Sequence, residues 1–377
     1  MSESELNLLY SEIEQELRAS VRELLAHRCP WQSVLDRVSH HAPAEVTDRA
    51  LWQELAELDV LGLFVPETLG GAGATAREAS SVAEELGRAV APVPFLGSAV
   101  LATGALVALG TAEEQVRALL TDLAAGQRCA TLVVPLPTAP GSGFPSQVRA
   151  DGSQLTGTVP GVVDALSADV LVVPALGAEG PGLYLLPADQ ATLSPVVSLD
   201  QTRPLAEVTL TGAEATRVAV GQQAVDAVEA ALLTGAVLLA AEQLGTAEWA
   251  FDTTVAYLKE RVQFARPIGS FQALKHRVAD LWVLLAQARA VVRHAASALA
   301  ADSEDLPLAA ALAQAFVSEV AVKVTEEAVQ LHGGIGFTWE HPVHLYLKRA
   351  KSASLSLGTA DRHRARIADL VGLPPAP

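Results

Sequence analysis

The sequence predicts an α+β protein with three parts: an N-terminal helical domain, a small antiparallel β domain and a C-terminal four-helix bundle. Apolar residues recur every three or four positions in the first third of the chain and again after about Val218, which is the spacing of amphipathic helices. Between these parts, from about Gly126, short β-rich runs alternate with turn residues. We therefore place the domain limits at residues 1–122, 123–217 and 218–377.

The first domain is predicted to be helical, with proline and glycine residues separating its helices. The first helix carries an apolar stripe, interrupted by glutamate and arginine, at Leu6, Leu9, Ile13, Leu17, Val21 and Leu24. A proline and three glycines mark the following VPETLGGAG stretch as a loop. The other predicted segments are helices at Asp48–Leu58, Arg77–Gly87 and Leu101–Leu120, with the loop at Val65–Gly73.

The middle domain is predicted to be a small antiparallel sheet. The pair Asp151-Gly152 lies between β-forming residues, and this dipeptide is a strong signal for a two-residue hairpin. The predicted strands are Cys129–Val134, Gln154–Val159, Val170–Val173, Leu183–Leu186 and Glu207–Leu210.

The last domain is predicted to be a bundle of four long helices joined by short connections. Pro267 cannot continue the first of them, because proline lacks the amide hydrogen that a helix interior needs. The predicted helices are Asp226–Lys259, Gln272–Leu299, Pro307–Leu331 and Pro342–Asp369.

Composition narrows the function and the compartment. The formal net charge of −17 leaves no basic surface for nucleic acid and disfavours an anionic membrane. The two cysteines, Cys29 and Cys129, lie in unrelated contexts, as in a cytosolic protein with incidental thiols. The longest apolar run, Ala230–Ala241, is shorter than the roughly 20 residues of a membrane span, and the acidic start is unlike a signal peptide. We expect a cytoplasmic protein without a membrane span.

Two segments resemble motifs of the acyl-CoA dehydrogenase family. RVQFARPIGSFQ, at Arg261–Gln272, is similar to the family's R-x-x-F-G-[RK]-P-[IL]-x-x-[FH]-Q, and QLHGGIGF, at Gln330–Phe337, is similar to its Q-x-x-G-G-x-G-[FY]. The resemblance covers nearly the whole chain. It implies an FAD-dependent oxidoreductase that acts on an acyl thioester and binds FAD across a subunit boundary.

The resemblance also implies the residues that contact FAD. Arg261 would meet the pyrophosphate with a planar charged fork, and Gly333 and Gly334 would give the cofactor room beside the backbone. The complete set of cofactor residues carried over from the family is Arg261, Phe264, Phe271, Gln272, Gln330, His332, Gly333, Gly334, Thr359 and Asp361. The family's loop T-E-x-x-x-G-S-D and strand W-[IV]-[ST]-N are degenerate here, at Pro135–Gly143 and Gly161–Asp164.

The family's catalytic base is missing. The glutamate of E-G-T, which removes the substrate's α-proton, is Leu357, and the alternative position that some relatives use is Gly235. Asp361 lies one helical turn beyond Leu357 and is a weak candidate for a displaced base. Arg349 stands where the family has the aspartate of R-D-A. No metal is expected, because the histidines at 332, 341 and 344 lack metal-ligand spacing.

Three functions stay open from the sequence. In the first, the chain is one subunit of a hetero-oligomeric acyl-CoA dehydrogenase whose partner carries the glutamate. The resemblance links this arrangement to sterol side-chain and dicarboxylate degradation. Alternatively, it is a dehydrogenase acting alone with Asp361 as base. The third reading is an enzyme of specialised metabolism that reuses the pocket for other chemistry. The substrate in each case is an acyl group on CoA or on a carrier protein, and we expect a homo- or hetero-oligomer.

Overall fold

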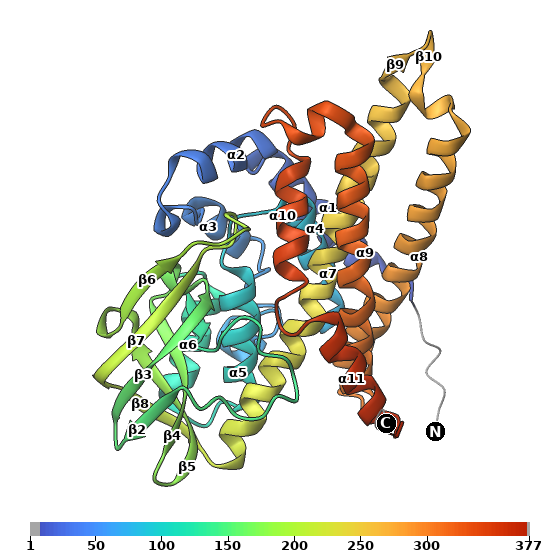
Figure 1. The fold of residues 1–377 in the computed structure, drawn as a ribbon. Coiled ribbons are helices and arrows are strands. Elements are labelled where there is room, and N and C mark those ends of the chain that lie inside the picture. Colours follow the sequence, from blue (N-terminus) through green and yellow to red (C-terminus); the bar gives the residue numbers. More distant parts are fainter. Residues whose placement is uncertain (1–7, 375–377) are drawn as a thin grey trace.

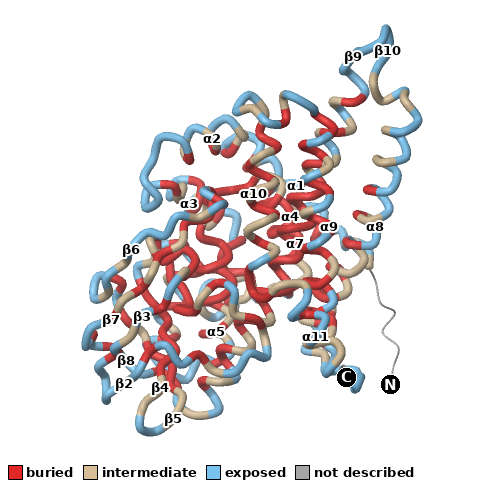
Figure 2. The backbone as a smooth tube through the Cα atoms, viewed as in Figure 1, coloured by how far each residue is buried: buried red, intermediate tan, exposed pale blue. Residues whose placement is uncertain are grey.

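The computed structural model describes residues 8–374, so Leu6 of the predicted first stripe lies outside the described part. Helices from the two ends of the chain pack together on one side, and the β domain lies beside them (Figure 1). The buried residues continue from the long central helices toward the sheet (Figure 2). Both helical parts share one hydrophobic cluster, and a smaller cluster lies within the β domain. The domain limits therefore stay a prediction.

Two of the N-terminal helices begin at a capping box. Ser11 caps the first helix and forms a capping box with Glu14, and Thr75 and Glu78 do the same for the fourth. The predicted helix over Leu101–Leu120 is wrong as one element, because Gly110 has a positive φ and separates two helices. The helices are α1 Glu12–Arg28, α2 Trp31–His40, α3 Arg49–Glu57, α4 Ala76–Ala89, the π-helix Phe95–Ala102, α5 Thr103–Ala108 and α6 Glu114–Ala124.

The β domain is largely antiparallel, with strand order β6-β7-β3-β2-β4-β5-β8. The predicted hairpin at Asp151-Gly152 is confirmed, since Asp151 pairs with Gln154 across the turn from β2 to β3. Two contacts are parallel, β1 with β4 and β2 with β4, which the sequence pattern did not indicate. The strands are β1 Ala130–Leu132, β2 Val148–Asp151, β3 Gln154–Val163, β4 Val170–Gly177, β5 Gly180–Pro187, β6 Thr192–Val196, β7 Leu205–Glu214 and β8 Thr216–Val220.

The C-terminal part has three long helices as predicted, but its last helix is broken. Leu357 and Gly358 both have positive φ, 53° and 102°, so the predicted helix Pro342–Asp369 is wrong as one element. A Cβ on Gly358 would lie 2.7 Å from Cβ of Ala139, so only glycine fits this close approach to the β domain. The helices are α7 Gln222–Glu260, α8 Gln272–Ala300, α9 Leu306–His332, α10 Val343–Ala353 and α11 Ala360–Leu370.

Helix α7 is the axis of the molecule and packs against α4, α8, α9 and α10. With 39 residues it is roughly 58 Å long. By length and composition α7 and the helical segment Leu306–Phe337 are apolar enough to cross a membrane, but most of each apolar window is buried inside the protein, as in a core helix.

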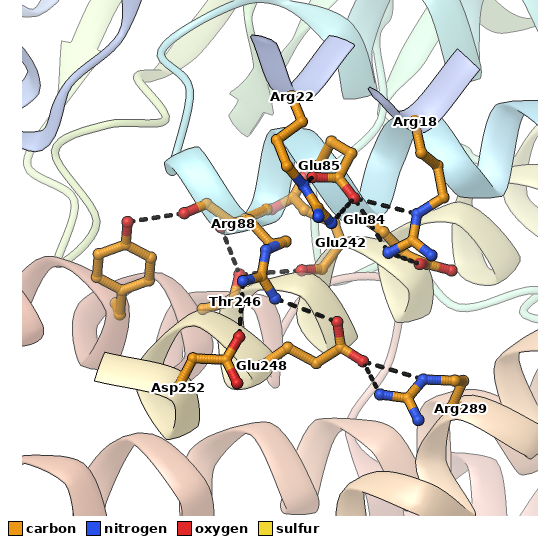
Figure 3. Close-up of polar contacts among 12 residues, drawn as sticks. Arg18, Arg22, Glu84, Glu85, Arg88, Glu242, Thr246, Glu248, Asp252 and Arg289 are labelled. Carbon is orange, nitrogen blue, oxygen red and sulfur yellow. Dashed lines mark hydrogen bonds and ion pairs between the residues drawn. The ribbon is translucent and has the colours of Figure 1, made fainter. Parts of the chain in front are cut away.

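Helices α1, α4 and α7 are also joined by a group of ion pairs (Figure 3). Arg18 and Arg22 of α1 both bind Glu85 of α4, which is 1% exposed. Arg88, at the end of α4, pairs with Glu248 and Asp252 of α7. These charges are largely paired with one another, so the first helix is anchored to the centre of the fold.

Candidate cofactor and acyl site

The segment between α7 and α8 forms an arm that projects from the bundle (Figure 1). Two short strands, β9 Val262–Gln263 and β10 Arg266–Pro267, pair antiparallel. The turn between them is Phe264-Ala265, and both residues have left-handed φ values, 51° and 60°. This conformation is uncommon for side chains larger than glycine, and it holds Phe264 outward with 86% of its surface exposed.

The arm carries four of the predicted cofactor residues. Arg261 is exposed and has no ion pair among the described residues. Phe271 packs edge to face with Phe264, with ring centroids 6.0 Å apart, and the guanidinium of Arg266 lies 4.0 Å from its ring. Gln272 is exposed at the first turn of α8. An unpaired guanidinium and an exposed aromatic ring on the same arm fit the diphosphate and a flat ring of FAD.

The backbone of the turn after α9 has free space beside it. Gly333 has a φ of 61°, and a Cβ added at Gly333 or at Gly334 would meet nothing within 4 Å. Gln330 is exposed at the end of the same helix. A flat or phosphorylated ligand can therefore approach this turn, as the resemblance implies.

His332 does not share this exposure. Its ring is 2% exposed and stacks between Tyr257 and His341, with centroid distances of 4.6 and 4.3 Å. Its Nδ1 donates to the carbonyl of Ala328 at 2.7 Å, which leaves Nε2 buried without a partner. Burial lowers the pKa of His332. The side chain supports the glycine turn from inside, so a direct cofactor contact by its ring is not supported.

Thr359 and Asp361 lie in a different part of the molecule. They line an open groove of about 500 Å³ between α9, α10 and α11, together with Lys351, Leu355 and Glu319. The neighbouring Leu357 contacts Gly235 of α7, whereas Arg261 directly follows the end of that helix. Gly235 and Arg261 are 26 positions apart, roughly 39 Å along the axis of an α-helix. One FAD cannot reach both sets in a single chain.

The two positions predicted for the base are neighbours in space. Leu357 is fully buried, and a Cβ on Gly235 would come 3.0 Å from Cδ1 of Leu357. Leu101 of the π-helix completes the contact, with its Cδ2 2.6 Å from the same Cβ position. Sequence reasoning did not identify Leu101. Apolar side chains therefore fill the place where the base would act.

The degenerate loop Pro135–Gly143 closes over this contact. The amide of Leu357 donates to the carbonyl of Leu136 at 2.7 Å, and the amide of Leu136 donates to Gly161 of the degenerate strand at 3.0 Å. Ser142 accepts from Arg362 of α11 at 3.2 Å. Hydrogen bonds within the chain thus join the loop, the strand and the turn that would face a flavin.

Buried charges surround this closed region. Arg349 is 3% exposed and pairs with Asp200 at 3.0 Å and with Glu242 at 3.1 Å, and Glu242 also binds Arg203. The positive charge at the family's aspartate position is therefore matched by two carboxylates. Asp164, at the end of the degenerate strand, accepts from the amide of Gly97 at 2.9 Å, and burial raises its pKa to about 6.

The weak candidate base faces away from the closed contact. The Asp361 side chain is 94% exposed and pairs with Arg364 at 3.1 Å. His363, which the sequence reasoning passed over, lies inside instead, with Nε2 2.9 Å from the carbonyl of Leu357. The described residues contain no group of three or more His, Cys, Asp or Glu placed to hold a metal ion. These positions weigh against a displaced base at Asp361.

Comparison with known proteins agrees with this architecture. The chain matches the family described as acyl-CoA dehydrogenase, N-terminal domain, over residues 11–127 and that described as acyl-CoA dehydrogenase, C-terminal domain, over residues 225–372. It is 40% identical to acyl-CoA dehydrogenase IpdE2 of Mycolicibacterium smegmatis, across 82% of this chain and 84% of that protein.

Solved structures include relatives of similar shape. A variant of the Tcur3481-Tcur3483 steroid ACAD is 32% identical with a TM-score of 0.84, covering 96% of this chain and 98% of that one. The ChsE4-ChsE5 complex from Mycobacterium tuberculosis is 29% identical with a TM-score of 0.86, covering 98% and 100%.

Proposed function

Because the chain belongs to the acyl-CoA dehydrogenase family, whose members are FAD-dependent oxidoreductases, we propose that it is the base-less subunit of a hetero-oligomeric dehydrogenase. In this role it completes the FAD site of a partner that carries the catalytic glutamate. The observation that carries the proposal is the contact of Leu357 with Gly235, since both positions for the base are apolar and buried together.

The reaction needs a proton acceptor that this contact does not provide. FAD, when bound, supplies the hydride acceptor for the β-carbon of the acyl group. The α-proton must leave to a base within hydrogen-bond reach. Leu357 and Gly235 have no group that accepts a proton, and Leu101 fills the space beside them. The proton is therefore taken by the partner's glutamate, in the partner's pocket.

This chain's own contribution lies on the arm and the glycine turn. Arg261 would hold the diphosphate with charge-assisted hydrogen bonds, and Phe264 would offer a ring face. Gly333 and Gly334 would let the dinucleotide lie against the backbone. All four are exposed at the end of the bundle opposite the Thr359 groove, where a second subunit can reach them.

The relatives favour a steroid-derived acyl thioester as the substrate class. The ChsE4-ChsE5 and Tcur3481-Tcur3483 proteins are each named as a pair of chains, and the second is named as a steroid enzyme. We propose that this chain likewise works in a pair of chains and acts on a steroid-derived substrate. We propose acyl-CoA as the form of the substrate and the cytoplasm as the compartment. No feature of the described residues favours the carrier-bound alternative.

Co-expression with a base-bearing family member tests the proposal. We expect the chain alone to purify with little FAD, and the co-expressed pair to form a stable complex with one FAD for each pair of subunits. Acyl-CoA thioesters should bleach the flavin of the complex, and a Glu→Gln change in the partner's base should abolish the bleaching. A fully loaded flavoprotein obtained without any partner, bleached by acyl-CoA, would falsify the proposal.

A further inference from the structure

A cavity of about 290 Å³ lies apart from both halves of the candidate site. It opens where α1 ends and α2 begins, against the end of α4 and the middle of α7. Trp249, in its wall, is 14 positions from Gly235 and 12 from Arg261, so it lies roughly 20 Å from each along the helix. The proposed function uses none of the residues that line it.

Aromatic rings form much of this cavity. Trp249 and the buried Tyr346 stack with centroids 3.6 Å apart and planes 2° from parallel, and Trp31 lies at another wall. The chain has only five tryptophans, so two of them at one cavity is a marked concentration. Cavities of roughly 300 Å³ or more with aromatic walls and a few polar groups are typical small-molecule sites.

The two arginines that line the cavity are both paired with carboxylates, and each keeps one N–H donor without a partner in the described part of the chain. Arg22 binds Glu85 at 2.7 Å, and Arg88 pairs with Asp252 at 2.7 Å and with Glu248 at 3.3 Å. Within the described residues, Nη1 of Arg22 and Nε of Arg88 have no hydrogen-bond partner, and both arginines line the cavity. Tyr346 already donates its hydroxyl to the carbonyl of Arg88 at 2.7 Å.

We propose that this cavity binds a small, flat, uncharged ring that carries a carbonyl acceptor. The ring packs against the aromatic wall in the offset or edge-to-face arrangement that aromatic rings prefer, and the carbonyl accepts from the free arginine N–H groups. An anionic ligand is disfavoured because it would have to compete with Glu85, Glu248 and Asp252 for the two guanidinium groups. Burial also raises the pKa of the Cys29 thiol at the cavity to about 12, so this wall is uncharged as well.

Three matched probes test the chemistry on the purified full-length chain. They are 4-hydroxyacetophenone, 4-ethylphenol, which lacks the acceptor, and 4-hydroxybenzoate, which is charged. Ligand-observed NMR titration should show binding of the ketone and about tenfold weaker binding of 4-ethylphenol, the effect of one lost hydrogen bond to a charged donor. The benzoate should also bind more weakly than the ketone.

Two variants locate the site. Trp249→Leu removes the stacking ring, and Ala26→Trp places a bulky side chain from the exposed face of α1 into the cavity. Both should abolish ketone binding, while Trp282→Leu, at an exposed tryptophan of α8, should leave it unchanged. Circular dichroism checks that each variant is folded. The proposal is overturned if the ketone does not bind, if its binding survives Ala26→Trp, or if either matched probe binds as tightly.

Discussion

Two regions of this chain resemble the FAD-contacting segments of the family, and the structure gives them opposite properties. The inner region, Leu101, Gly235 and Leu357 with the loop 135–143, is buried, apolar and joined by direct backbone hydrogen bonds. The outer region, the arm 261–272 and the turn 330–334, has exposed positions with an unpaired arginine and open glycines. The inner region, where this chain's own reaction would take place, is closed. The outer region, which would contact a neighbouring subunit, is accessible.

Under the proposed function, the contrast teaches how one fold can close its own pocket and still offer cofactor-binding residues to a neighbour. The inner region is stabilised by features that a working pocket cannot have, such as Leu357 packed onto Gly235. The outer region keeps features that cost stability in an isolated chain, namely an exposed Phe264 and two left-handed residues in its turn. Variants in each region therefore have different expected effects.

The largest expected effect is loss of folding stability in Arg349→Ala, at the edge of the inner region. Removing this buried guanidinium leaves Asp200 without its partner and weakens the pairing of Glu242. Breaking a buried ion pair in this way costs about 3–5 kcal/mol. Urea denaturation measures the loss, with Arg217→Ala as the control, because its exposed pair with Glu179 should contribute under about 1 kcal/mol. Equal losses in the two variants would mean that the inner region is not locked by its charges.

Leu357→Glu should be the next most damaging change, and it should not create activity. The new carboxyl would lie in a fully buried position beside Leu101, so burial would raise its pKa and the fold would lose about 3 kcal/mol. The volume-conserving Leu357→Met should lose less than about 1.5 kcal/mol. Denaturation and flavin bleaching by a panel of acyl-CoA thioesters measure both properties. Bleaching by the Leu357→Glu chain on its own would show that the inner region still holds a working flavin.

Arg261→Ala should leave the fold intact and weaken cofactor binding in the complex. Arg261 is exposed, so its loss hardly affects stability. Hydrogen bonds from a charged donor contribute about 1.5–3 kcal/mol, so FAD should bind roughly 10- to 100-fold more weakly to the complex. Flavin fluorescence during dialysis measures retention, and Arg217→Ala again serves as control. Unchanged retention would remove the outer region from the FAD site.

Much of this contrast was accessible from the sequence. The family motifs and the missing glutamate are local patterns. So are the predicted hairpin at Asp151-Gly152 and the first three long helices of the C-terminal part, which the structure confirms. Helix α7 was predicted over Asp226–Lys259 and runs over Gln222–Glu260, because a continuous apolar pattern without proline leaves few alternatives.

The remaining features depend on contacts between distant segments. The break at Leu357-Gly358 follows from the close approach of Ala139 in the β domain, and periodicity within the last helix contains no sign of it. The same holds for Leu101 above Gly235 and for the two carboxylates around Arg349, which come from the β6–β7 connection and α7. The cofactor residues were predicted as one set. The fold separates them into one group on the side of Gly235 and another at Arg261, and these two positions are roughly 39 Å apart along the axis of α7. Motif matching gives residue identities, and the resemblance implies a site across a subunit boundary, but neither gives the distance between the two sets.

The smallest expected effect is a pH dependence that begins beneath the glycine turn of the outer region. Burial, with smaller contributions from the neighbouring His332 and His344, lowers the pKa of His341 to about 4. In the unfolded chain this histidine titrates near its usual value of about 6.5. The folded state therefore binds fewer protons between these values, and stability is lost as the pH falls from about 6.5 toward 4.

His341→Asn should remove part of that loss. Asparagine keeps an acceptor for the amide of Val343, which lies 3.3 Å from Nδ1 of His341, but it does not titrate. Because the ring is only half buried, the difference in unfolding free energy between pH 7.5 and pH 4.5 should shrink by only about 1 kcal/mol. Urea denaturation at both pH values measures it, with His40→Asn as an exposed control.

If the complex also retains FAD better at pH 4.5 in His341→Asn, the histidine cluster and the outer region act together, since the ring of His332 links His341 to the turn at Gly333. An unchanged pH slope would mean that the protons responsible bind elsewhere, and the support of the glycine turn by this cluster would then be purely steric.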